Sequence, residues 1–411
     1  MEMVKTGNAA AFVEGLKSSF GDLSASRLRS VNELSEMDFP TVRNERWKYT
    51  RLTKFQKETF QINKSISTLN LSFTKDHSLN RIVFINGFFS QENSNIQEKG
   101  FAWSEMKDET ILTSEFQSSL FTKINDAFFT SGLDIEIKEN IDRPIEVVFI
   151  SQGEKNTSQI RNRIRVAKGK QASFRFIFES ADNHVGFTNV LTKVLVEQNA
   201  QLSIQQLQNE NLLNYHFNTM VVEQEGDSRF TVNTFSLDAH LIRNNLFISS
   251  NGENTESNLN GLYITNGVRH VDNQTVMDHT RPHALSNELY KGIMDEQSSA
   301  AFNGKVFVRQ DAQKINAYQS NSNILLSETA QVNSKPELEI YADDVKCSHG
   351  STTGQLDEEA LFYLQARGIS EKSARLLLVQ AFAGDVINKI EDEEFRLKVE
   401  EQIASKFNWI K

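Results

Sequence analysis

Cys347 is the only cysteine in the chain, and it lies two residues before His349. A thiolate and an imidazole are both ligands for iron or zinc. The residues just before them, 337–342, alternate between polar and apolar side chains, which predicts a strand. If that strand continues through Cys347, both donors project from one face, because residues i and i+2 of a strand share a face. Two donors make an incomplete metal site, so we expect a partner chain to complete it.

An alternative role for Cys347 is that of a small buried side chain, as is common for a free cysteine. The neighbours Asp343, Asp344 and Lys346 are polar, which favours a position near solvent. A cation at Lys346 would favour the thiolate form. A protease-like nucleophile is disfavoured, because Cys347 and His349 would project in parallel and no oxyanion-hole pattern accompanies them.

A second polar cluster contains His270, Asp272, His279 and His283. The separations between these residues mix the period of a strand with that of a helix, so no single face collects all four. Structural hydrogen bonding is therefore favoured over metal ligation.

The composition of the 411 residues limits the classes of function. The net charge of −10 argues against a nucleic-acid partner. A single cysteine excludes an internal disulfide and an all-cysteine metal cage within one chain. The N-terminus has no signal-peptide pattern, and no apolar run is long enough to cross a membrane. We therefore expect a cytoplasmic protein without membrane contacts.

The sequence lacks common motifs for nucleotide binding and for serine-hydrolase catalysis. It has no Walker-type phosphate loop, no dinucleotide-binding fingerprint and no Gly-x-Ser-x-Gly elbow. The chain is therefore not expected to hydrolyse ATP itself, and we expect no enzymatic activity.

Helical patterns occupy the two ends of the chain. Residues 8–36 carry an apolar stripe, and a short helix is expected around residues 114–129. Between them, residues 39–52 are both aromatic and basic, which favours a packed connector over an interaction surface. After Gly354, acidic residues, Gly368 and Ser370 mark the boundaries of further helices. Apolar surface left over on this C-terminal helical cap would seat a partner.

Strand-like runs follow one another from Leu133 for over 200 residues, with no helical stripe between them. Three turns resemble one another, beginning at Val166, Val196 and Val222, which are 30 and 26 residues apart. Imperfect repetition of this length predicts a solenoid of stacked coils, with the Asn-rich residues 251–260 at a corner. A two-sheet sandwich is the main competitor, but it gives no reason for such a period.

Several segments resemble one known family. Residues 335–350 and 353–364 carry the most specific motif, and residues 46–50, 279–283 and 286–292 extend the likeness over most of the chain. Together they resemble the SufB/SufD family of iron–sulfur cluster assembly scaffolds, and in particular its SufD branch. SufB members have more cysteines, so the lone Cys347 fits the SufD branch.

The resemblance implies a mainly β fold, with a right-handed parallel β-helix core between N-terminal and C-terminal α-helical regions. The corresponding domains are residues 1–132, a helical or mixed region, residues 133–350, the β-helix, and residues 351–411, the helical domain. This architecture agrees with the solenoid that the repeats predict.

The resemblance also implies a non-enzymatic scaffold subunit within a SufBCD-type complex. A SufB-like paralogue would meet the chain near the end of the β-helix, and a SufC-like ABC ATPase would dock on the C-terminal helical domain. Cys347 and His349 match the positions linked to iron acquisition and nascent cluster formation, with iron or a cluster held only transiently. The isolated chain could also form a homodimer. Two other functions remain open, a polysaccharide-active β-helical enzyme and a structural adaptor with an inert Cys347.

Overall fold

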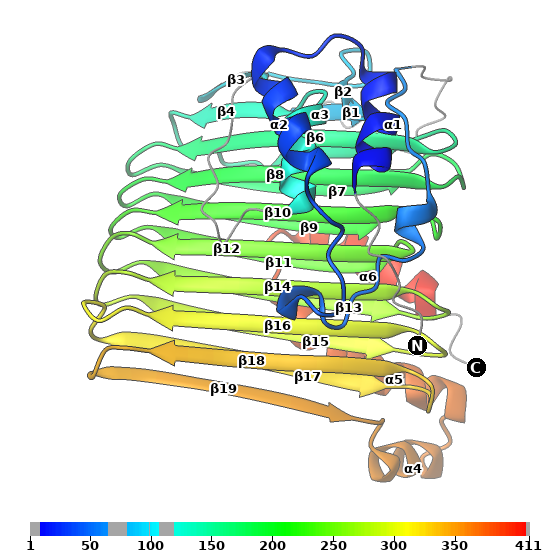
Figure 1. The fold of residues 1–411 in the computed structure, drawn as a ribbon. Helices are drawn as coiled ribbons and strands as arrows, with labels where there is room; N and C mark the ends of the chain where they lie inside the picture. Colours follow the sequence, from blue (N-terminus) through cyan, green and yellow to red (C-terminus); the bar gives the residue numbers. More distant parts are fainter. Residues whose placement is uncertain (1–8, 65–79, 98, 107–118, 408–411) are drawn as a thin grey trace.

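A computed structural model describes residues 9–64, 80–97, 99–106 and 119–407 of the chain. The fold is mainly β, with a parallel β-solenoid between helices at the two ends of the chain (Figure 1). Sheet A contains, in chain order, β1 (Asn80–Ile85), β2 (Phe88–Phe89), β5 (Ile145–Ser151), β7 (Gln171–Ser180), β9 (Gln201–Asn209), β11 (Arg229–Asp238), β13 (Glu256–Thr265), β15 (Leu285–Met294), β17 (Ile315–Leu325) and β19 (Val345–Gly354). Sheet B contains β3 (Phe101–Glu105), β4 (Leu133–Ile137), β6 (Asn156–Val166), β8 (Gly186–Val196), β10 (Tyr215–Gln224), β12 (Leu241–Ser250), β14 (His270–His279), β16 (Ser299–Val308) and β18 (Gln331–Ile340).

From β4 onward, successive strands alternate between the two sheets, so each coil gives one strand to sheet B and one to sheet A. From β4 onward every strand pairs in parallel with the strand two places along the chain, as β12 does with β10 and β14. Antiparallel pairs occur where β1 meets β2 and where β3 meets β4. Parallel stacking of coils confirms the predicted solenoid and is not the arrangement of an antiparallel sandwich.

The repeat inferred from the turns is correct for two copies and wrong for the third. Val166 pairs with Val196 as predicted, but Val196 then pairs with Gln224, and Val222 pairs with Val194. The error is two residues. Because side chains alternate with a period of two, such a shift keeps every apolar residue on its face, and pattern alone cannot detect it.

One corner of the solenoid uses left-handed backbone in successive coils. Gly169, Asn199, Asp227 and Asn254 all have positive φ there, of 69°, 56°, 62° and 57°. Glycine and asparagine tolerate this conformation best, which confirms the predicted use of asparagine at corners. Only residues 251–255 of the segment 251–260 form that corner, since β13 begins at Glu256.

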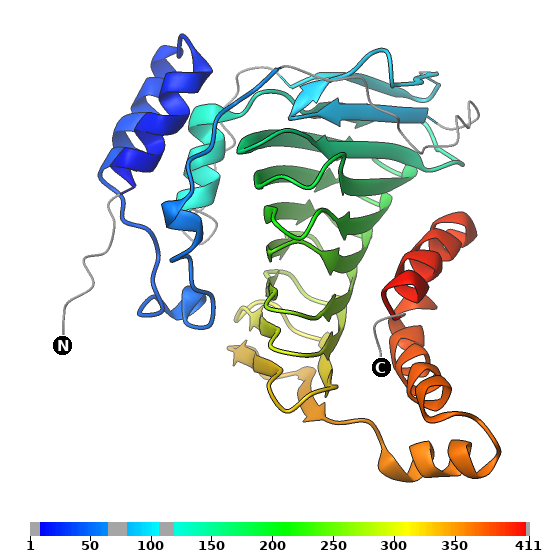
Figure 2. The same cartoon turned by 90° about the vertical axis from the view of Figure 1, so that its right-hand side faces the viewer.

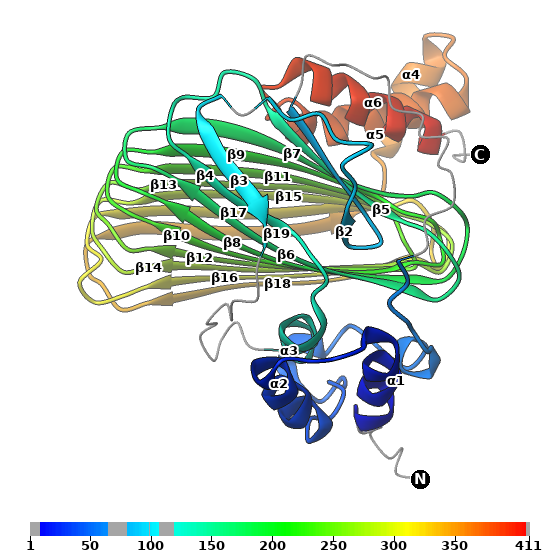
Figure 3. The same cartoon turned by 90° about the horizontal axis from the view of Figure 1, so that it is seen from above.

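The helices of the chain pack on the outside of the solenoid. They are α1 (Ala10–Phe20), α2 (Ala25–Ser35), the 3-10 turns η1 (Glu45–Trp47) and η2 (Phe55–Lys57), α3 (Leu120–Phe128), α4 (Glu358–Ala366), α5 (Glu371–Ile387) and α6 (Glu393–Phe407). The N-terminal helices lie against sheet B and the C-terminal helices against sheet A, on opposite sides of the solenoid (Figures 2 and 3). Each interface has its own apolar core, and a third core fills the solenoid interior.

The helical pattern predicted over residues 8–36 is confirmed by two helices, α1 and α2, and residue 8 lies outside the described part of the chain. Gly21 ends α1 with a φ of 87°, and the Ser24 side chain caps the start of α2. In the connector that follows, Trp47 is buried and stacks on Phe121, which in turn stacks on Phe217 of β10. The packed-connector interpretation of residues 39–52 is confirmed for these aromatic side chains.

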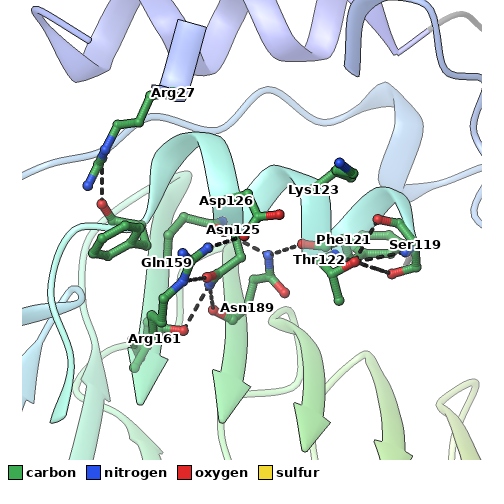
Figure 4. Close-up of polar contacts among 12 residues, drawn as sticks. Arg27, Ser119, Phe121, Thr122, Lys123, Asn125, Asp126, Gln159, Arg161 and Asn189 are labelled. Atoms are coloured by element: carbon green, nitrogen blue, oxygen red, sulfur yellow. Dashed lines mark hydrogen bonds and ion pairs between the residues drawn. The ribbon is translucent and has the colours of Figure 1, made fainter. Parts of the chain in front are cut away.

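Helix α3 is fixed to sheet B by polar contacts that Figure 4 shows. The Asn125 amide donates to the carbonyl oxygens of Ile160 and Asn189, at 2.8 and 3.2 Å. In return the Asn189 amide donates to the Phe121 carbonyl oxygen, and buried Arg161 pairs with Asp126. The helix predicted over 114–129 is confirmed for its second half, while residues 114–118 lie outside the described part of the chain.

The C-terminal helices end and begin where the sequence predicts. Gly368 adopts a φ of 87° after α4, and Ser370 caps α5 through the backbone N–H of Ser373. Phe395 and Val399 of α6 are buried against sheet A. Within the described ranges, no helix is long and apolar enough to span a bilayer.

Candidate functional site

The predicted donor pair lies on β19, the last strand of sheet A. Cys347 pairs in register with Ala317 of β17, and His349 pairs with Gln319. Because these positions are i and i+2 of one strand, both side chains project to the same side, as predicted. That side is the solenoid interior, since Ala317 belongs to the interior core and Cys347 packs against it.

The environment of the Cys347 thiol differs from the one predicted. Burial raises the pKa of the thiol, and a backbone hydrogen bond from Ala317 lowers it only in part. Lys346 is exposed on the opposite face of β19, one residue away, so it supplies no cation to the sulfur. The expectation of a lysine-stabilised thiolate is therefore wrong. The thiol is half-buried at the open end of the solenoid, whereas His349 is exposed.

Cys347 and His349 are the metal donors that the sequence analysis placed at this end of the solenoid. In the described ranges of the chain, no group of three or more histidine, cysteine or acidic side chains is positioned to hold a metal ion. Any further ligands for iron at Cys347 and His349 would have to come from outside those residues.

The outer edges of the last two strands are open. Among the described residues, no strand pairs with the far side of β18 or β19. The backbone N–H and C=O groups of such an edge are ready to pair with another chain. Cys347 and His349 therefore lie directly beside a surface suited to a protein partner.

The solenoid interior next to the donor pair is polar. Sheet A stacks Glu288 of β15, Gln319 of β17 and His349 of β19 in one inward-facing row. In the same row of earlier coils stand Phe174 and Ile204, which are apolar. The change from apolar to polar coincides with the approach to the open end.

Glu288 is a functional candidate that the sequence analysis missed. It is 7% exposed, and its Oε2 accepts a hydrogen bond from Gln319 Nε2 at 2.6 Å. Burial raises the pKa of Glu288 to about 7, because no cation offsets the loss of water. An acidic residue at an inward position of β15, between Ser286 and Tyr290, is the sequence signal that could have identified it.

Comparisons with known proteins decide the family. Residues 149–382 match the family model described as "SUF system FeS cluster assembly, SufBD core domain". The chain is 31% identical to the iron–sulfur cluster assembly protein SufD of Escherichia coli, over 92% of this chain and 91% of that protein. The chain belongs to the SufBD family of iron–sulfur cluster assembly proteins.

Two further relatives agree with this assignment. An iron–sulfur cluster assembly SufBD family protein of Synechocystis is 30% identical over 92% of this chain and 90% of its own length. The SufD protein of Bacillus subtilis is 22% identical over 81% of this chain and 76% of its own length. Within the SufBD family the chain belongs to the SufD branch, and its role is in iron–sulfur cluster assembly.

Two histidines of the second cluster form hydrogen bonds within the fold. His270 hydrogen-bonds Thr50 and Ser299, each at 2.8 Å, and so connects the N-terminal segment to β16. His279 bonds Ser286 at 2.9 Å, and His283 occupies a solenoid corner with a φ of 63°. Structural hydrogen bonding is confirmed for His270 and His279.

The C-terminal helices carry exposed apolar side chains on the side away from sheet A. Phe362 and Tyr363 of α4 are 71% and 58% exposed, and Leu377 of α5 and Leu397 of α6 are also exposed. Phe362 and Tyr363 are adjacent, and large exposed apolar side chains that lie together are typical of a protein contact surface.

Proposed function

We propose that this chain is the scaffold subunit of a SufBCD-type complex, in which Cys347 and His349 take part in iron acquisition and nascent cluster formation. The observation that carries the proposal is the position of both donors on the interior side of β19, whose outer edge is open. A half-site at an open edge can hold iron only when a partner adds ligands. Iron and cluster are thus transient cargo of the complex.

The partner at this edge is a SufB-like chain. Every residue of β18 retains some solvent exposure, and Ile340 and Tyr341 just beside the edge are exposed apolar side chains. Strand addition at β18 and β19 would satisfy the free backbone groups and cover these side chains. It would also bring the partner's ligands to within reach of Cys347 and His349.

The SufC-like ABC ATPase docks on the exposed apolar surface of α4 and α5. Phe362, Tyr363 and Leu377 supply the large apolar contacts that often carry most of the energy of an interface. ATP hydrolysis belongs to that subunit, and the present chain is not catalytic.

Alanine substitutions in the copurified three-subunit complex test the donor pair. Cys347→Ala and His349→Ala should each reduce the yield of reconstituted cluster, measured by visible absorption and bound iron. Ser348→Ala is the matched control, because residue 348 lies between the two donors and its side chain points to the opposite face of β19. The thermal midpoint and subunit ratio should stay unchanged in all three variants.

Two outcomes would contradict the proposal. If Ser348→Ala reduced the yield as much as the donor variants, the effect would reflect a disturbed strand. If Cys347→Ala lowered the thermal midpoint and the yield of soluble chain together, the cysteine would have a packing role instead.

A further inference from the structure

The row of Glu288, Gln319 and His349 contains an unusual hydrogen-bonding arrangement. Gln319 is 4% exposed and donates its amide Nε2 to Glu288. Its Oε1 is buried and has no hydrogen-bonding partner among the described residues. Burying a carbonyl oxygen without a hydrogen-bond donor is unfavourable, so this arrangement calls for an explanation.

The direction of that oxygen follows from the strand order. Glu288 lies on β15, on one side of β17, and His349 lies on β19, on the other side. The oxygen and nitrogen of a planar amide point in different directions, so an amide that points its nitrogen at Glu288 turns its oxygen away from that carboxylate. The neighbouring inward side chain on the other side is that of His349.

Space across the interior is matched to the Gln319 side chain. Gly304 of sheet B stands opposite, and a Cβ there would come within 2.2 Å of Gln319 Nε2. Thr275, the register partner of Gly304, lies near Glu288 and lowers its pKa against the larger effect of burial. Gln319 is thus held from two sides, while the side chain of His349 is exposed.

We propose that Glu288 and Gln319 are positioning residues for His349. Glu288 fixes the orientation of the Gln319 amide, and Gln319 Oε1 accepts a hydrogen bond from one ring N–H of His349. The imidazole is then held in a single tautomer, with its other nitrogen unprotonated and available as an iron ligand beside Cys347. Histidines that bind metals commonly donate their second ring N–H to such an acceptor.

This inference deepens the proposed function, because it assigns residues that prepare one of the two donors. It differs from that function in being a property of the chain by itself. The tautomer of His349 is set before any partner or metal arrives, so it can be measured in the isolated full-length chain.

Nitrogen-15 NMR of histidine-labelled protein at pH 8 measures the tautomer directly. The two ring-nitrogen resonances of His349, identified by their loss in His349→Asn, should be widely separated in the unsubstituted chain, as for one neutral tautomer. In Gln319→Met, which preserves side-chain length and removes the acceptor, they should move toward each other as both tautomers become populated. Tyr318→Phe, on the same strand and the opposite face, should leave them in place.

A reciprocal exchange provides the rescue. In the double variant E288Q/Q319E the amide stands on β15 and the carboxylate on β17, so the donor and acceptor roles are exchanged. The second carboxylate oxygen can still accept from His349, and the separated resonances should return. A variant that only loosened the fold would not restore the tautomer by this exchange.

Averaged resonances for His349 in the unsubstituted chain, matching those of Gln319→Met, would overturn the inference. Failure of the double variant to restore the separated pair while retaining the thermal midpoint would overturn it as well. Neither result touches the role of Cys347 and His349 in the complex, which the cluster reconstitution tests separately.

Discussion

Glu288 is a buried carboxylate that faces Gln319 and Thr275 rather than a cation. Ionising such a group costs stability, so a chain selected only for folding would place an uncharged residue there. Glu288 lies one coil before Gln319 and two coils before His349. In the proposed arrangement its charged carboxylate accepts the hydrogen bond that fixes the Gln319 amide, which explains why an acidic residue stands there. Proteins commonly retain residues that lower stability where those residues serve function.

Replacing Glu288 should remove a pH dependence of stability. Its pKa is 4.5 in the unfolded chain and about 7 when folded, so between these values the folded chain binds the extra proton. Stability from this group is therefore lost as pH rises from about 4.5 to 7. Glu288→Gln should be more stable than the unsubstituted chain at pH 8, by about 1–3 kcal/mol, and similar to it at pH 4.5. Urea unfolding at the two pH values measures this, and an equal difference at both would contradict it.

Gly292 is required by close packing in the interior. A Cβ at Gly292 would lie 2.2 Å from the Tyr263 ring and 2.5 Å from the Asn323 amide oxygen, whereas at Gly350 of β19 it would meet no atom within 4 Å. Gly292→Ala should lower stability by about 1–3 kcal/mol through overpacking. Gly350→Ala, the matched control, should change it little. Thermal unfolding compares the two, and equal midpoints would contradict the packing argument.

At the scale of elements, the C-terminal helices are tied to sheet A by buried charge pairs as well as by apolar packing. Arg175 of β7 is 4% exposed and bonds both carboxylate oxygens of Asp392, at 2.6 and 2.7 Å. Lys406 of α6 pairs with Asp238 at the end of β11. These contacts lie at the two ends of α6 and fix its direction across the sheet.

Arg175→Met should therefore loosen α6 without unfolding the solenoid. Removing one partner of a buried pair leaves Asp392 uncompensated, and we expect a local loss of about 2–3 kcal/mol, reduced from the fully buried case because Asp392 is partly exposed. Hydrogen exchange in α6 should accelerate while that in β10 and β12 does not. Arg165→Met breaks an exposed pair with Glu197 and serves as the control. Equal acceleration in both variants, or none in either, would contradict the assignment.

At the scale of the whole molecule, the solenoid is closed on two flanks by helices and left open at its last coil. The end of a solenoid usually needs a capping element, because its last coil exposes core side chains and unpaired backbone groups. Here the last coil ends in β18 and β19, and among the described residues no further strand pairs with their outer edges. The same open surface that suits a SufB-like partner also suits a second copy of this chain.

The isolated chain should therefore dimerise in a concentration-dependent way through this end. Ile340→Lys, which places a charge at the exposed end of β18, should shift the chain toward monomer, while Leu377→Lys on α5 should not. Sedimentation velocity over a range of concentrations separates the species. A dimer that resists Ile340→Lys and responds to Leu377→Lys would place the contact on the helical domain instead.

The sequence by itself determined the features that depend on local backbone geometry. Alternation with a period of two identified the strands and put Cys347 and His349 on one face, and glycine and serine at helix ends located α4 and α5. The family motif added what the strand pattern could not, the expectation that this pair takes part in cluster assembly.

Only the tertiary structure decided which coils lie beside each other and in what register. Glu288 and Gln319 are 31 residues apart, and they meet because that separation is the length of one coil. The length of a coil is set by its corners, which the strand pattern does not reveal. The register of the third repeat and the burial that raises the pKa of the Cys347 thiol also depend on how distant coils stack. Side-chain direction is a property of a few bonded residues, whereas burial and neighbours depend on how distant coils stack.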